Sequence, residues 1–283
     1  MIMPLTSVKK LSAQRGHARL IVESVAGQSA VTSAYASNPL KLLTPRSRGQ
    51  SVWAYASSFG GGLVAGDETR LELRLDRSAR CFLGTQASTK IYRNPRRLAC
   101  GHVTRATIEA DTLLVFAPDP VQPFAGSGYA QRQSFHLGPG AGLVLVDWFT
   151  SGRAARGERW AFDRFQSRND VFLSGERIFT DSLLLDAAAE PLTSPHRTGR
   201  FNCFALLLLV GEPLRSAAAA LLENVSARPV TRTAPLVASA SPVRHGAVLR
   251  LAGESVEQVG RELHHHLQFA SELLGDDPWA RKW

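Results

Sequence analysis

Residues 69–76 alternate strictly between apolar and polar side chains, and this pattern limits the possible fold more than any other feature. Leu71, Leu73 and Leu75 fall on one side, and charged residues occupy the positions between them. Successive side chains of a β-strand point to opposite faces of the sheet. The segment therefore predicts a half-buried strand with a charged outer face.

Many further segments have the length and composition of short strands, and glycine- or proline-containing turns separate them. We expect strands at 18–25, 30–36, 51–59, 80–85, 102–109, 112–117, 132–137, 142–149, 159–166, 170–174, 177–185, 201–210 and 246–251. Helical segments do not alternate with these strands, which argues against a βαβ fold. The sequence predicts a mainly β protein.

Two segments are predicted to be helical. Residues 213–224 begin with a proline and are rich in alanine, and residues 256–274 follow the capping box formed by Ser255 and Gln258. The second segment carries one apolar stripe and ends at Gly275. We expect residues 226–244 to form a mobile loop and residues 276–283 to be an exposed tail. With no shift in composition along the chain, residues 1–283 are predicted to form one domain.

Composition indicates a globular, basic protein. Hydrophobic residues make up 44% of the 283 residues, which excludes wholesale disorder. Five of the 33 cationic residues are lysines and the other 28 are arginines, and the net charge is +9. Arginine favours bidentate contacts with carboxylates or phosphates, so both an acidic protein surface and a nucleic acid fit this charge.

The same composition limits the cellular setting. Three cysteines cannot build a disulfide framework, and the first ten residues lack the apolar core of a signal peptide. The longest apolar run, residues 204–210, is far shorter than the ~20 residues that a membrane helix needs. We expect a cytoplasmic protein without a membrane partner.

A glycine-rich segment contains Gly60, Gly61, Gly62, Gly66 and Asp67. It is not a phosphate-binding loop, because no Lys-Ser/Thr pair follows Gly66 and Asp67 would repel a phosphate. We expect a tight turn between two antiparallel strands, with at least one glycine at positive φ.

Two histidine-containing motifs are weak candidates for metal binding. Cys100 and His102 lie two residues apart, which places both on one face of a strand, although a packed cysteine beside a surface histidine explains the pair more simply. Residues 264–266 are consecutive histidines on a predicted helix, where side chains point ~100° apart and cannot converge on one ion. We interpret them as surface or rim residues.

Residues 85–92 form a polar run within a strand-rich region. Thr85 and Thr89 alternate with Gln86 and Lys90, so polar groups occupy both faces of the segment. Such groups need partners when they are buried. Either surface exposure or a water-filled passage inside a β-structure would satisfy them.

The segment after residue 146 combines an acidic residue at a strand end with a cationic stretch. Asp147 and Trp148 end an apolar run, and residues 153–168 are rich in arginine with Trp160, Phe162 and Phe165 interleaved. The stretch is either a solvated face or a binding surface for an acidic partner. No G-x-S-x-G motif or other catalytic constellation accompanies it, so we do not expect an enzyme.

Four separated segments, in this order, resemble the UreD family of urease accessory proteins, called UreH in some bacteria. They are residues 59–67, 85–92, 117–124 and 146–153, the last continuing through Arg156, Gly157 and Glu158. The resemblance is clear over residues 15–185 and thin after residue 195. Ala65 departs from the serine found in many relatives.

The resemblance implies a non-enzymatic, largely β, helically stacked protein that assists nickel insertion into apo-urease. It implies a complex with a UreF-like protein and, through it, a UreG-like GTPase. Nickel would be in transit through an internal tunnel, with no tightly bound cofactor. The family-motif and tunnel candidates are Gly60, Gly61, Gly62, Gly66, Asp67, Thr85, Gln86, Thr89, Lys90, Pro118, Asp119, Pro120, Asp147, Trp148, Gly152, Arg153, Gly157 and Glu158.

Four acids at the ends of these segments are candidates for transient nickel contacts: Asp67, Asp119, Asp147 and Glu158. Isolated carboxylates bind a borderline ion weakly enough to release it, whereas paired thiolates would trap it. Alternatively, the acids accept hydrogen bonds from backbone N–H groups at turns. The 256–274 helix is a candidate docking element for the UreF-like partner, or it packs into the core. A basic nucleic-acid-binding β-protein is the alternative function.

Overall fold

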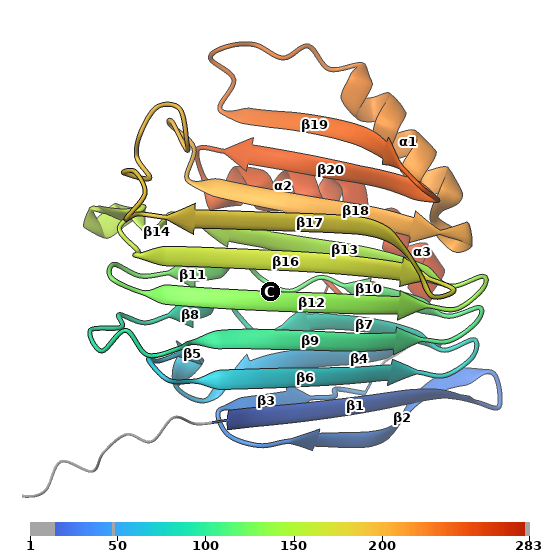
Figure 1. The fold of residues 1–283 in the computed structure, drawn as a ribbon. Helices are drawn as coiled ribbons and strands as arrows, with labels where there is room; N and C mark the ends of the chain where they lie inside the picture. Colours follow the sequence, from blue (N-terminus) through green and yellow to red (C-terminus); the bar gives the residue numbers. More distant parts are fainter. Residues whose placement is uncertain (1–14, 47–48, 281–283) are drawn as a thin grey trace, which may run out of the picture.

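The computed structural model describes residues 15–46 and 49–280. Its main feature is a pair of β-sheets stacked face to face (Figure 1). Sheet A has seven strands, in the order β17 (Glu176–Asp186), β16 (Arg164–Leu173), β12 (Gly128–Leu137), β9 (Gly101–Ile108), β6 (Glu68–Leu75), β1 (Arg15–Val25) and β2 (Gln28–Ala36).

Sheet B lies behind sheet A in the view of Figure 1. Its main path is β19 (Leu236–Val243), β20 (Gly246–Gly253), β18 (Cys203–Gly211), β13 (Gly142–Thr150), β10 (Leu113–Phe116), β7 (Arg80–Thr85), β4 (Val52–Ser58) and β3 (Leu40–Leu43). Three short strands extend this sheet at one end: β5 (Gly62–Leu63), β8 (Thr89–Ile91) and β11 (Val121–Pro123). A separate two-stranded ribbon joins β14 (Gly152–Arg153) and β15 (Glu158–Arg159).

The central strands wind as a solenoid. Each turn passes through sheet A, sheet B and the short strands, as in β6, β7 and β8, and the next turn repeats the path through β9, β10 and β11. Successive turns pair in parallel in all three places, and the solenoid has about 4 turns. Strands make up 51% of the structure, so the prediction of a mainly β, helically stacked fold is confirmed.

Three helices cover the outer face of sheet B. They are α1 (Arg215–Ser226), α2 (Val256–Leu267) and α3 (Phe269–Leu274), and a 3₁₀ turn over Glu212–Leu214 precedes α1. The capping box at Ser255 is present as predicted. The single helix expected over 256–274 is interrupted at Gln268, after which α3 contacts β7 and Arg80 Nη1 donates to the Leu273 carbonyl (2.9 Å). No helix among the described residues has the length and apolar character to span a membrane.

Apolar side chains form three buried clusters. The inner core lies between the sheets and includes Leu73 and Leu145, whereas the outer core lies between sheet B and the helices and includes Val144. Strand β13 is thus apolar on both faces, as its continuous hydrophobic run requires. The stripe of α2, with Leu263 and Leu267, is buried in the outer core. Core packing therefore occupies the apolar stripe of α2, as the alternative interpretation expected, and docking of a partner on this helix stays a prediction.

The third, aromatic cluster corrects a second expectation. Trp160, Phe162 and Phe165 are at most 3% exposed. Phe165 stacks on Phe149, Trp160 meets Phe149 edge-on, and Phe162 contacts both Trp160 and Phe165. They belong to the interior because the chain folds back at this end to cover the sandwich. The aromatic residues of the cationic segment therefore form no binding surface.

Several expected boundaries differ from the structure. The strands expected at 159–166 and 170–174 are replaced by the short β15 and by β16, which pairs with β12 over its full length. The loop expected at 226–244 contains β19, which has no charged residue and pairs with β20. The expected exposed tail packs inward as far as it is described, since Trp279 contacts Phe82 edge-on. Residues 281–283 of that tail lie outside the described residues.

The glycine-rich turn also differs in part. Gly60, Gly61 and Gly66 have φ values of 77°, 71° and 94°, so the expected left-handed conformation is confirmed. The turn does not connect antiparallel strands, however. It carries the chain from β4 in sheet B through the short β5 to β6 in sheet A, because the solenoid changes sheet at this point.

Candidate functional site

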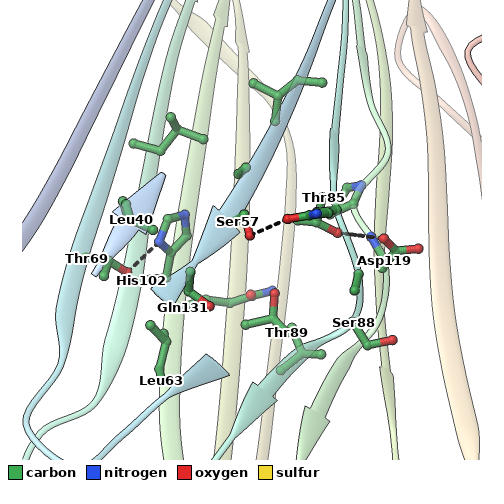
Figure 2. Close-up of a pocket in the computed structure, with 18 of the residues that line it drawn as sticks. Leu40, Ser57, Leu63, Thr69, Thr85, Ser88, Thr89, His102, Asp119 and Gln131 are labelled. Carbon is green, nitrogen blue, oxygen red and sulfur yellow. Dashed lines mark hydrogen bonds between the residues drawn. The ribbon is translucent and has the colours of Figure 1, made fainter. Parts of the chain in front are cut away.

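An inner cavity of about 320 Å³ lies between the two sheets, beside the ends of β4 and β7 (Figure 2). Eight of the eighteen residues predicted from the family motifs line it: Gly61, Thr85, Gln86, Thr89, Pro118, Asp119, Asp147 and Trp148. They come from the turns after three successive strands of sheet B and from β13. The solenoid thus brings together residues that are up to 87 positions apart, from 61 to 148.

A band of polar side chains crosses the inner face of sheet A beside the cavity and forms part of its wall, and we call this band the polar belt. Its members are Thr69, His102, Thr104, Gln131, Gln133, Ser167 and Asn169. They occupy paired register positions in four neighbouring strands, β6, β9, β12 and β16. The inner core lies on one side of the belt and the aromatic cluster lies on the other. A polar band across an apolar interior needs its own hydrogen-bond partners.

Asp147 supplies those partners from the facing sheet. Its carboxylate accepts hydrogen bonds from Gln131 Nε2 (2.7 Å), Ser167 Oγ (2.7 Å) and Asn169 Nδ2 (2.8 Å). Gln131 Nε2 also donates to Ser167 Oγ (2.9 Å), and Gln133 Nε2 donates to Asn169 Oδ1 (2.8 Å). The network fixes the position of one carboxylate between the sheets.

The environment of Asp147 also sets its acidity. Burial raises the pKa of the Asp147 carboxyl, and the three side-chain hydrogen bonds oppose that rise. Burial penalises the charged form, whereas donors directed at the carboxylate favour it. Asp147 is therefore a buried acid whose raised pKa is moderated by three neutral hydrogen-bond donors.

Among the described residues, Asp147 alone lines both the inner cavity and a second cavity of about 260 Å³. The second cavity lies on the β17 and β18 side of Asp147 and includes Asp181, Arg197 and Arg250. Arg250 Nη2 donates to Asp181 Oδ1 (2.8 Å) across the edges of the two sheets. Asp147 therefore stands at the junction of two interior spaces.

A second carboxylate, that of Asp119, lines the inner cavity on the side opposite the polar belt. Asp119 Oδ2 accepts a hydrogen bond from Thr85 Oγ1 (2.9 Å), and the Asp119 N–H donates to the same hydroxyl (2.7 Å). Nearby, Ser57 Oγ donates to Gln86 Oε1 (2.9 Å), and Figure 2 shows Ser57, Thr85 and Asp119 beside the cavity. Trp148 Nε1 donates to the Pro118 carbonyl (2.7 Å), which fixes the indole in the wall. The polar run at residues 85–89 faces both the cavity and the surface.

His102 lies in the wall opposite Asp119. Thr69 Oγ1 is 2.7 Å from Nδ1 of the ring, and Thr104 Oγ1 is 3.0 Å from Nε2. Burial lowers the pKa of the imidazole to about 4. The ring is therefore neutral at physiological pH.

The other predicted residues lie outside the inner cavity. Asp67 accepts a hydrogen bond from the Val64 N–H (2.9 Å) and stabilises the glycine-rich turn. Glu158 forms an ion pair with Arg153 and accepts a hydrogen bond from the Ala125 N–H (3.3 Å). The Arg153 hydrogen bond lowers the pKa of Glu158. The remaining residues outside the cavity lining are Gly60, Gly62, Gly66, Lys90, Pro120, Gly152 and Gly157.

Sequence reasoning missed most of the polar belt, although a signal was present. Thr69 falls on the same face as Leu71 and Leu73, and Gln131 and Gln133 fall on the same face as Phe135. A polar residue on the apolar face, repeated at the same end of neighbouring strands, indicates a polar interior. The register that aligns these positions is visible only in the structure.

The remaining metal candidates do not form a chelating site. Among the described residues, no group of three or more His, Cys, Asp or Glu side chains is placed to hold a metal ion. Burial raises the pKa of Cys81, Cys100 and Cys203 to about 12, so none is a thiolate at neutral pH. The predicted pair of Cys100 and His102 lines one open groove, and His102 alone also lines the inner cavity.

The three consecutive histidines have different environments. His264 and His265 are exposed, in agreement with the prediction, and His264 lies against Trp279. His266 is buried instead and contacts Glu262 one helical turn away (3.0 Å). The expectation of a surface residue is wrong for His266, because its position on α2 faces the outer core.

Comparisons with known proteins agree on one family. A family model described as UreD urease accessory protein matches residues 14–283. A urease accessory protein UreD of Sorangium cellulosum is 49% identical over 95% of this chain and 84% of its own length. One from Anaeromyxobacter is 40% identical over 94% of this chain and 89% of its own. A urease accessory protein D of Oryza sativa is 34% identical over 91% of this chain and 93% of its own.

Proposed function

The chain belongs to the UreD family of urease accessory proteins, and from this premise we propose that it supports urease maturation by giving nickel a path through its interior. The function requires an aqueous route that attracts a divalent cation and then releases it. Asp147 carries the proposal, since this single carboxylate borders both interior cavities. The proposed route runs from the inner cavity past Asp147 into the second cavity.

The donor groups along this route fit nickel as a cargo. Asp119 and Asp147 offer carboxylate oxygens, and hydroxyl and amide groups surround them. Such ligands attract Ni²⁺ while leaving much of its hydration in place. Within the described part of the chain, no tight site would retain the ion. The buried thiol of Cys81 is protonated, and the acidic side chains are not grouped as metal ligands.

Asp67 and Glu158 have a different role in this proposal. Each holds a turn near one end of the sheets through backbone or ion-pair contacts, and neither lines the inner cavity. We therefore restrict the nickel contacts to Asp119 and Asp147. Asp67 and Glu158 support the loops around the cavity.

The route also implies partners that deliver and receive the ion. We propose a non-enzymatic scaffold that binds a UreF-like protein and, through it, a UreG-like GTPase, and that docks on apo-urease in the cytoplasm. The basic surface suits an acidic protein partner. The names of the relatives support the urease-maturation role, and the interior route gives that role a physical basis.

The test replaces Asp147 by Asn in cells that co-produce apo-urease and the accessory proteins. Asn preserves the size of the side chain and removes the charge, so we expect urease with less nickel per active site, measured by mass spectrometry, and correspondingly lower activity. The matched control is Glu223→Gln, which removes a carboxylate from the exposed surface of α1.

Pull-down of the UreF-like partner shows whether each variant still assembles. Nickel-poor urease from an Asp147→Asn variant that still binds its partner supports the route. Fully nickel-loaded urease from that variant would overturn it.

A further inference from the structure

His102 occupies a position between two spaces, one inside the sandwich and one outside. Together with Thr69, it lines both the inner cavity and an open groove of about 680 Å³ across the first residues of β1, β6, β9 and β12. Figure 2 shows the ring beside Thr69, with Gln131 next to it. Gln131 in turn donates to Asp147, so the imidazole is adjacent to the network that holds the central carboxylate.

Both ring nitrogens of His102 have a hydroxyl within hydrogen-bond distance. Thr69 Oγ1 lies 2.7 Å from Nδ1 and 3.2 Å from the Gly101 carbonyl oxygen, and Thr104 Oγ1 lies 3.0 Å from Nε2. A neutral imidazole carries a proton on one ring nitrogen and keeps a lone pair on the other. A threonine hydroxyl both donates and accepts, so it can release this lone pair to another ligand by rotating.

This lone pair differs chemically from every other ligand in the cavity wall. Among the described residues that line the inner cavity, His102 is the one histidine, and there is no cysteine. Carboxylate, carbonyl and hydroxyl oxygens suit Mg²⁺ and Ca²⁺, whereas imidazole nitrogen suits Ni²⁺ and its neighbours. A route built only from oxygen ligands would thus discriminate less between nickel and magnesium than one that also contains an imidazole.

We propose that the unprotonated ring nitrogen of His102 is a transient ligand that selects nickel over magnesium within the inner cavity. The inference rests on the proposed nickel route and adds the group that gives this route its selectivity. One imidazole with water and a distant carboxylate binds weakly, so the ion can leave.

The test is nuclear magnetic resonance of the full chain with ¹⁵N-labelled histidine, purified with its partner where that is needed for solubility. Ni²⁺ is paramagnetic and broadens the signals of imidazoles that it binds. We expect Ni²⁺ to remove the His102 ring signals at concentrations that leave the His136 signals visible. Mg²⁺ at the same concentrations should leave both sets unchanged.

Two variants assign the signals and provide matched controls. His102→Asn removes the proposed ligand, and His136→Asn removes an exposed imidazole that stacks on Phe172 on the outer face of sheet A. Signals of His102 that persist when those of His136 have broadened would overturn the proposal. A response of His102 to Mg²⁺ equal to its response to Ni²⁺ would also overturn it.

A urease maturation experiment distinguishes a failure of the proposed His102 selectivity from a failure of the proposed nickel route. At limiting nickel and rising magnesium, the His102→Asn variant should yield urease with progressively less nickel than the His136→Asn variant. Equal nickel loading by these two variants, together with nickel-poor urease from Asp147→Asn, would reject the selectivity and keep the route. Full loading by Asp147→Asn would reject the route, whatever the spectra of His102 show.

Discussion

The side chain of Gln131 on β12 donates a 2.7 Å hydrogen bond to the Asp147 carboxylate on β13, and this contact joins the two sheets across the interior. Ser167 and Asn169 donate to the same carboxylate from the next strand of sheet A. Three neutral donors and no cation therefore hold this acid. A cationic side chain at this position would compete with a divalent cargo for the carboxyl group, whereas neutral donors do not.

The first prediction concerns the pH dependence of stability. Because the folded pKa of Asp147 is raised, the folded protein binds this proton more tightly than the unfolded chain does. The contribution of Asp147 to the free energy of unfolding is therefore largest below the ordinary aspartate pKa. It falls as the pH rises through the interval up to the raised pKa. Asp147→Asn removes that fall.

Urea unfolding of both proteins at a series of pH values, from acidic to neutral, provides the check. The other ionisable groups are common to the two proteins, so the difference between the two curves isolates Asp147. We expect the wild type to lose stability relative to Asp147→Asn as the pH rises. Parallel curves would contradict the raised pKa.

The second prediction compares two neighbouring glycines. Gly61 has φ +71° with nothing within 4 Å of an added Cβ, so Gly61→Ala introduces only left-handed strain, about 1–2 kcal/mol. Gly62 has extended backbone, but an added Cβ would lie 2.3 Å from the Lys90 carbonyl oxygen on β8. Backbone in a sheet cannot yield easily, so Gly62→Ala should cost more than Gly61→Ala, about 3 kcal/mol or above. Thermal unfolding of the pair measures the difference, and an equal loss would argue against the close approach of β5 and β8.

The third prediction concerns the cysteines. All three thiols are buried and have pKa values raised to about 12, so the reactive thiolate is scarce at neutral pH. We expect the folded protein to react with an aromatic disulfide reagent only after denaturant is added, with three thiols then titrating. Rapid reaction of any thiol in the folded protein would show that the interior opens more readily than the structure indicates.

The fourth prediction concerns the C-terminal helices. Leu263 is 3% exposed in the outer core, so Leu263→Ala should lower the free energy of unfolding by about 2–5 kcal/mol. Arg261→Ala on the exposed side of the same helix should change it by less than about 0.5 kcal/mol. Urea titration of both variants gives the comparison. A tolerated Leu263→Ala would mean that the stripe of α2 is free to bind a partner after all.

Local patterns were sufficient to predict much of the fold. The alternation around Leu71, the capping box at Ser255 and the glycine-rich turn all describe interactions within a few residues of the chain. The short strands β8 and β11 were missed, since pairing between solenoid turns rather than propensity stabilises them. The edge strand β19 was missed because alanine, serine and proline indicate a loop when its neighbour β20 is not considered.

The candidate site could be predicted only where the polar residues stood out from their surroundings. Asp119 and Asp147 end family-like segments, and the structure places both at the inner cavity. Asp67 and Glu158 have the same sequence context, but each accepts a hydrogen bond from a backbone N–H group. No local feature of the sequence distinguishes these two acids from Asp119 and Asp147. The contacts of Gln131 and Asn169 could not be predicted from the sequence, because only the parallel register of β12 and β16 places both residues opposite Asp147.

Blocking the inner cavity reversibly is the most direct test of the proposed nickel route. Ser57 lines the cavity and is partly exposed, so Ser57→Cys provides one reactive thiol against the three buried ones. A bulky thiosulfonate reagent attaches there through a disulfide that a reductant removes. Ser226→Cys, at the end of α1 on the surface, is the matched control.

The measurement is the nickel acquired by apo-urease from Ni²⁺ in the purified complex with the accessory proteins. The proposed route predicts that labelled Ser57→Cys transfers little nickel and recovers after reduction, while labelled Ser226→Cys transfers nickel normally throughout. Transfer by labelled Ser57→Cys at the rate of the unlabelled protein would contradict passage of nickel through the inner cavity.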